Sequence, residues 1–169
     1  MILAIVQHTP VWIWGLLIAL IALGLSQTRD REMPLRRVTV LPLVLIVLSA
    51  SGVLSAFGHA PVALGGWASG VGAALLLARE AVAVRGARWL ASSGRVHVPG
   101  SWLPLALIVA LFCVKYVAGA SLAMHPELAS NATFAGLCSL AYGGFSGLFL
   151  ARGLSLRQLA TRRGGPSAA

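Results

Sequence analysis

Lys115 is the only lysine in the chain, and it lies in an otherwise apolar stretch, LFCVKYVAGASLAM (residues 111–124). An amine in hydrocarbon loses its water, at a cost of several kcal/mol, so we expect Lys115 to point toward other helices or toward the outer surface. Ser139 and Tyr142, at a similar depth in the next apolar segment, are candidate partners in a site for an anionic head group or substrate. The alternative is that the stem of Lys115 only extends to water or to Glu127.

Cys113 and Cys138 lie in the same two apolar segments, without the CxxC spacing of a zinc site. If the two segments are neighbours, the thiols lie a few ångströms apart in depth, and a redox pair is one hypothesis. The alternative is that each cysteine is a small apolar filler in a membrane helix.

Three histidines stand beside prolines at expected helix ends, in the strings HTP, HAP and HP. With Met124, His59 and His125 offer thioether and imidazole ligands, which suit copper or haem iron. The alternative is turn chemistry, because proline is favoured at the first position of a helix. The chain has no HxxxH or CxxCH spacing, so we expect no cofactor.

Membrane helices must position these groups, because the composition excludes a soluble fold. Of the 169 residues, 58% are hydrophobic and 10% are charged, and the mean hydropathy is +0.87. Soluble domains are closer to about half apolar and about a quarter charged. The net charge of +9 does not indicate nucleic-acid binding, because the arginines occur in three short clusters between apolar runs.

Five apolar runs are near the roughly 20 residues that span a bilayer. The predicted fold class is therefore all-α, a polytopic membrane helical bundle of five transmembrane helices. One integral membrane domain (residues 1–163) is expected, followed by a disordered tail (residues 164–169). Glycines with four-residue spacing permit close approach of two helices: Gly66/Gly70 and Gly143/Gly147. The predicted spans are about 10–27, 38–58, 61–78, 102–123 and 131–151.

The arginines predict which way the spans run. The residues before the first span and the connections near 58–61 and 124–130 contain no Lys or Arg. Because basic loops stay in the cytoplasm, we expect a multi-pass protein of the bacterial inner membrane, with a periplasmic N-terminus and a cytoplasmic C-terminus. All twelve arginines follow the first, third or fifth span: Arg29, Arg31, Arg36, Arg37, Arg79, Arg85, Arg88, Arg95, Arg152, Arg157, Arg162 and Arg163.

The sequence also contains an internal repeat. LPLVLIV (41–47) and LPLALIV (103–109) agree at six of seven positions, and each begins a span that ends at a histidine and a proline. Each is followed by a glycine-rich span ending in LLLAR or LFLAR. We therefore predict a leading helix plus a duplicated helical hairpin, with chance similarity of leucine-rich spans as the alternative. Pro42 and Pro104 are expected in the first turns of their helices, where proline sacrifices no hydrogen bond.

The longest connection, residues 79–101, carries four arginines among apolar residues. Its first half is expected to be a helix in the head-group layer, where basic residues attract anionic lipid at about 1 kcal/mol each. Membrane lipid is therefore a predicted partner, together with partner membrane proteins or a second copy of the chain.

The opening LAIVQHTPVWIWGLLIALIALGLSQTR, followed by PLRRVTVLPL, resembles an uncharacterised family of small proteobacterial inner-membrane proteins. Those proteins begin with a His-Thr-Pro and a tryptophan pair, followed by a first loop with arginine and proline. The resemblance is clearest over residues 3–45. More distantly, the loop and LPL pattern resembles the CcdC-like membrane proteins, named after a locus linked to cytochrome c maturation. The resemblance implies a location and supplies no catalytic motif.

Two functions follow from these patterns. The chain has no phosphate-binding loop, no metalloprotease helix and no Ser-His-Asp arrangement, so it is not predicted to be an enzyme. The first hypothesis is a non-enzymatic accessory component or small carrier. The alternative is a membrane redox component that binds haem or copper at the outer face or uses the thiol pair.

Reporter fusions test the topology. A reporter active only in the cytoplasm should give signal at Ala169, and one active only outside should give signal in the connection near His125. Both follow from the positive-inside rule applied to five spans. Silence of the cytoplasmic reporter would contradict the five-span prediction.

Overall fold

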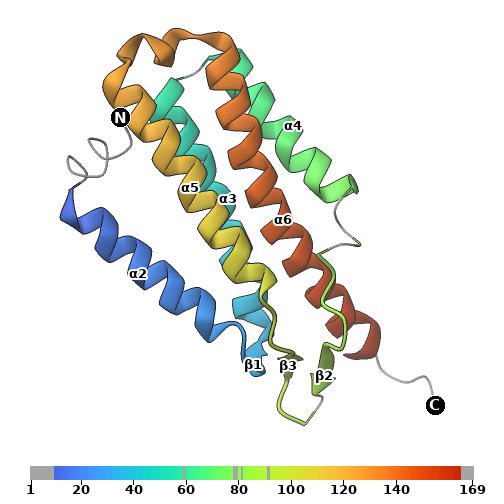
Figure 1. Cartoon of the computed structure of the whole chain (residues 1–169). Helices are drawn as coiled ribbons and strands as arrows, with labels where there is room; N and C mark the ends of the chain where they lie inside the picture. The colour runs from blue at the N-terminus through green and yellow to red at the C-terminus, as the bar shows by residue number, and fades with distance from the viewer. Residues whose placement is uncertain (1–9, 59, 78–79, 81, 91, 165–169) are drawn as a thin grey trace.

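The computed structural model describes residues 10–58, 60–77, 80, 82–90 and 92–164. Figure 1 shows α3, α4, α5 and α6 packed together, with α2 beside α5 on one flank and the three strands gathered at one end. In chain order the elements are α2 (Val11–Ser26), β1 (Arg31–Pro34), α3 (Leu35–Phe57), α4 (Pro61–Leu77), β2 (Arg88–Leu90), β3 (Arg95–Val98), α5 (Leu103–Met124), the 3-10 helix η1 (Pro126–Ser130) and α6 (Ala132–Gly164).

Three helices, α3, α5 and α6, are long and apolar enough to cross a membrane. α2 and α4 are apolar but have only 16 and 17 residues. At 1.5 Å per residue each is about 25 Å long, against a hydrocarbon core of about 30 Å. By length and composition, the described residues therefore contain three candidate spans where the sequence predicted five.

The helices begin and end within one turn of the predicted spans, except at the end of the last one. There α6 continues to Gly164, well past the expected end at residue 151. The tail predicted to be disordered begins at that same glycine, and residues 165–169 lie outside the described part of the chain.

α4 and α6 approach each other through the glycines that the sequence indicated. A Cβ atom added at Gly66, Gly70, Gly143 or Gly147 would lie within 2.8 Å of a backbone oxygen on the partner helix. At Gly143 that oxygen is the carbonyl of Trp67. The two backbones therefore touch, and no side chain fits between them at these positions.

α3 packs against α6 where Gly153 leaves room for the ring of Pro42, so a Cβ atom added at Gly153 would lie 2.5 Å from Pro42 Cγ. Pro104 lies in the first turn of α5 as expected. The same expectation for Pro42 is wrong, because α3 begins at Leu35 and places Pro42 inside the helix.

Residues 79–101 contain strands, which corrects two expectations, the all-α fold and a helix in this segment. β2 and β3 form a three-stranded antiparallel sheet with β1, in the order β1-β3-β2. Val96 and Val98, at alternate positions, are buried against Val38 of α3, and this period of two is that of a strand. Gly94, with a φ of 62°, turns the chain between β2 and β3.

Both predicted helix pairs, α3 with α4 and α5 with α6, are present along the chain. Their connections differ in length, because three residues (58–60) separate the first pair, whereas the second pair is joined through η1. The duplication itself stays a prediction.

We predict that Gly143→Ala destabilises the protein, whereas Gly144→Ala does not. The first change forces α4 and α6 apart at a backbone contact and is expected to cost about 1–3 kcal/mol. Nothing lies within 4 Å of a Cβ atom added at Gly144, and alanine favours a helix over glycine. Thermal unfolding of the two variants in detergent measures the difference, and equal melting temperatures would contradict the backbone contact.

Candidate functional site

The ammonium group of Lys115 points into the bundle, which is one of the two directions that the sequence allowed; the other was the outer surface. Its Nζ atom lies 4.4 Å from the centroid of the Tyr142 ring on α6. A Cβ atom added at Gly52 of α3 would lie 3.3 Å from the same nitrogen. The charge therefore lies between α3 and α6 over an aromatic face, which attracts a cation, while the residue as a whole is exposed.

A polar cluster surrounds Tyr142 in the middle of the bundle. Its carbonyl oxygen accepts hydrogen bonds from Ser49 Oγ at 3.3 Å and Ser146 Oγ at 2.8 Å, and Trp67 Nε1 donates to Ser49 Oγ at 3.2 Å. These bonds connect α3, α4 and α6. Ser139 is fully buried, and its hydroxyl has no hydrogen-bond partner in the part of the chain that the structure describes.

Of the three predicted ligand residues, the structure brings Lys115 and Tyr142 into contact. Ser139 is on the same helix as Tyr142, with its hydroxyl unused as described above. Ligand binding by these three residues stays a prediction.

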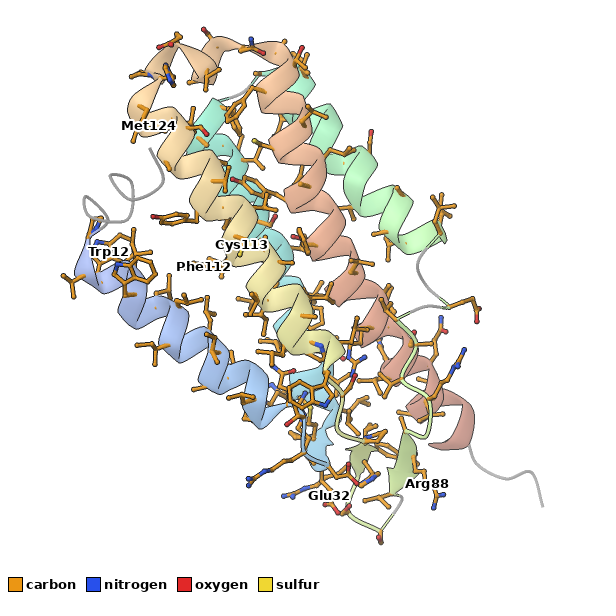
Figure 2. All side chains as sticks on the ribbon, in the orientation of Figure 1. Trp12, Glu32, Arg88, Phe112, Cys113 and Met124 are labelled. Carbon is orange, nitrogen blue, oxygen red and sulfur yellow. The ribbon has the colours of Figure 1, made fainter. Side chains whose placement is uncertain are left out.

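The predicted outer metal ligands are only partly described, because His59 lies outside the described residues. His125 is exposed and its Nδ1 atom lies 3.1 Å from Glu127 Oε1, while Met124 is exposed at the end of α5 (Figure 2). Within the described ranges, no three His, Cys, Asp or Glu side chains gather as metal ligands. The metal hypothesis therefore gains no support from His125 and Met124.

The two cysteines are free thiols in the structure. Cys113 is exposed on α5, where Figure 2 labels it, and Cys138 is half-buried on α6 among the apolar residues around Tyr142. The redox pair stays a prediction.

A cavity of about 900 Å³ lies between α2 and α5, with α3 and α6 contributing to its wall. Figure 2 shows Trp12 on α2 and Phe112 on the side of α5 that faces it. The sequence analysis missed this cavity. A signal for it exists in the small residues Gly119, Ala120 and Ala123, which leave space beside α5. The apolar wall includes Trp12, Leu16, Leu20, Leu41, Leu45 and Phe112.

Arg31, Arg37 and Arg152 line the end of the cavity beside the strands, which we call the inner end. Arg31 donates to Gln27 Oε1 at 2.9 Å, and Arg152, which is buried, donates to the Val82 carbonyl at 3.5 Å. Burial, and secondly the charge of Arg37, lower the pKa of the Arg31 guanidinium. The sequence analysis had interpreted these arginines only as topology signals.

The cavity has the form of a binding site for an elongated molecule. Its wall is apolar along most of its length, as in most ligand pockets, and its volume lies in their usual range. The inner end carries guanidinium groups, which bind carboxylates and phosphates through two parallel hydrogen bonds. The arrangement suits a molecule with a hydrocarbon part and a polar end.

Comparisons with known proteins agree with the resemblance to an uncharacterised family and extend it. The profile of a family of unknown function (DUF6622) matches residues 1–167. An uncharacterised protein of Pasteurella multocida (strain Pm70) is 32% identical over 63 residues, which cover 37% of this chain and 48% of that protein. The match thus spans about half the length of that relative. No solved structure matches the chain.

A double-mutant cycle tests the contact between Lys115 and Tyr142. Lys115→Met and Tyr142→Leu should be coupled by about 1 kcal/mol in detergent unfolding, because each change alone removes the cation–π contact. In a Tyr142→Phe background, which keeps the ring face, Lys115→Met should lower the free energy of unfolding by about as much as it does in the unaltered protein. A coupling near zero with Tyr142→Leu would contradict the contact.

Proposed function

We propose that this chain, which belongs to the DUF6622 family of unknown function, is an integral inner-membrane protein that binds a membrane lipid between α2 and α5. In this proposal it acts without enzymatic chemistry, as an accessory component or a small carrier. The observation that carries the proposal is the cavity of about 900 Å³ with its apolar wall.

The position of the cavity supports a lipid as its occupant. Its wall belongs to helices whose other faces also expose large apolar side chains, among them Ile18 of α2, Val47 of α3 and Val117 of α5. Surfaces of this kind are stable in hydrocarbon and unstable in water. A cavity between such helices is open to the acyl chains of the bilayer, so its natural filling is one of them.

The packing of α2 supports admission of a molecule from the side. α5 is the main neighbour of α2. Near the inner end the two helices touch where Gly24 makes room for Leu105. Toward the other end, the rings of Trp14 and Tyr116 are 6.5 Å apart between centroids. Because α2 packs mainly on α5, movement of its outer part away from α5 would leave the contacts among α3, α4 and α6 in place.

Five spans with the N-terminus outside remain the proposed topology. α2 and α4 are shorter than the bilayer core, but short apolar helices cross by local thinning of the bilayer at modest cost. The arginines of β1, β2 and β3 lie together at one end of the bundle, with Arg31, Arg88 and Arg95 among them. A single basic end supports the cytoplasmic orientation of that end.

We predict that filling the cavity removes bound lipid. Ala120 lines the cavity, so Ala120→Trp should displace an acyl chain and at least halve the lipid that remains after purification in a nonionic detergent. Val117→Trp is the matched control, because Val117 is on the same helix, is 62% exposed and does not line the cavity. Mass spectrometry of bound lipid measures both. Equal lipid in the two variants and the unaltered protein would contradict binding in the cavity.

A further inference from the structure

Three arginines from distant parts of the sequence meet at the inner end of the cavity. Arg31 begins β1, Arg37 lies in the first turn of α3, and Arg152 lies on α6. Arg31 is close enough to both Arg37 and Arg152 for electrostatic repulsion between their charges. The three guanidinium groups therefore form one positive group, which we call the arginine cluster.

No carboxylate of the described residues forms an ion pair with the arginine cluster. The chain has four acidic residues, and Glu80, which is exposed, makes no ion pair in the described ranges. Like charges this close repel unless an anion lies among them. An anion bound from another molecule would supply the negative charge that these residues lack. The other three acids pair elsewhere: Glu32 with Arg95, Asp30 with His97 and Glu127 with His125.

The arginine cluster also keeps unused hydrogen-bond donors. The Nε atom of Arg31 is buried and has no partner in the described part of the chain. Arg152 is 8% exposed, and its hydrogen bond to the Val82 carbonyl is long, at 3.5 Å. A guanidinium has five N–H donors in a fork that matches a phosphate or carboxylate. A phosphate at the inner end would satisfy donors that the protein itself leaves free.

Hydrocarbon surface begins directly beside the arginine cluster. Leu23 of α2, Leu41 of α3 and Leu156 of α6 line the same cavity, which continues along α2 to its outer end near Met124. The 16 residues of α2 span about 24 Å at 1.5 Å per residue. A small soluble anion would leave this wall uncovered, and a zwitterionic lipid would neutralise less of the positive charge of the cluster than an anionic lipid would. An anionic amphipathic molecule satisfies both parts of the cavity.

We propose that the ligand is an anionic phospholipid whose phosphate binds among Arg31, Arg37 and Arg152 and whose acyl chain lies along α2. This inference rests on the lipid binding proposed above and adds the class of lipid and its direction. The head group lies on the side of the strands, which is the cytoplasmic side of the proposed topology. Basic pockets between membrane helices on that side bind anionic head groups in other membrane proteins.

The test compares three probes on the purified full-length chain in a nonionic detergent. Phosphatidylglycerol, which is anionic, and phosphatidylcholine, which is zwitterionic, are titrated as mixed micelles, and inorganic phosphate is titrated alone. Bound lipid and the melting temperature are measured, because a ligand that binds only the folded state raises the melting temperature. Phosphatidylglycerol should bind at least tenfold more tightly than phosphatidylcholine. Inorganic phosphate should have little effect.

Arg37→Gln is the main variant, because Arg37 is exposed and its loss leaves no unpaired buried charge. It should weaken phosphatidylglycerol binding at least tenfold and weaken phosphatidylcholine binding less, because the choline group already offsets the charge of that lipid's phosphate. Arg36→Gln is the matched control, since Arg36 is the preceding exposed residue and does not line this cavity. Arg152→Lys keeps the charge and loses the fork, so a smaller loss is expected. Lys115 also lines the cavity, but it lies about 16 Å along α5 from Pro104 at the inner end, so Lys115→Met should weaken phosphatidylglycerol binding much less than Arg37→Gln does.

Each other outcome overturns a stated part of the proposal. Equal binding of the two lipids, unaffected by Arg37→Gln, would overturn the anionic head group and leave lipid binding itself in place. Binding of neither lipid would overturn both proposals. Loss of phosphatidylglycerol binding in Lys115→Met alone would move the anion to the outer half. If Arg36→Gln weakened phosphatidylglycerol binding as much as Arg37→Gln does, general surface charge would explain the effect. If inorganic phosphate raised the melting temperature as much as phosphatidylglycerol does, the site would bind a free anion and not a lipid.

Discussion

Glycines bring the backbones of α4 and α6 together so closely that no side chain fits between them at Gly66, Gly70, Gly143 and Gly147. Within a bilayer, helices gain nothing by hiding apolar side chains from each other, because lipid is equally apolar, and close packing takes over that role. α6 also receives α3 at Gly153 and carries the polar cluster around Tyr142. α3 and α4 therefore pack directly on α6, whereas α2 packs on the flank of α5.

The flanking position of α2 and the scarcity of acidic residues together produce the candidate site. Because α2 packs mainly on one neighbour, a gap remains between α2 and α5. Small residues of α5 such as Gly119 and Ala120 do not fill this gap. At the inner end, the sheet and α6 add arginines to this gap. With thirteen basic and four acidic residues in the chain, internal pairing cannot neutralise every arginine. The result is an apolar cavity with a cationic end.

Several features could be predicted because their causes are local in the sequence. The apolar runs predicted the helices to within a turn at most ends, and the glycine spacing indicated faces suited to close helix contact. The cost of a buried amine predicted that Lys115 turns away from lipid, toward the bundle or the outer surface. Pro42 was misplaced because hydropathy does not mark where a helix begins: α3 starts in the polar LRR stretch at Leu35. The strands were missed because β1 and β3 have only four residues each and carry charged side chains, and they become a sheet only by pairing with each other.

The sequence by itself determined the kind of molecule this is: an apolar helical chain with its arginines in three clusters between the apolar runs, no recognisable catalytic motif and one lysine within them. These properties depend on composition and on neighbours within a few residues, so the order of residues contains them. Only the tertiary structure decided that Arg31, Arg37 and Arg152 share one cavity. More than a hundred residues separate Arg37 from Arg152 in the sequence. They meet because α3 packs on α6 and β1 packs on α3 at the end of the bundle beside the strands, and no local pattern specifies that packing.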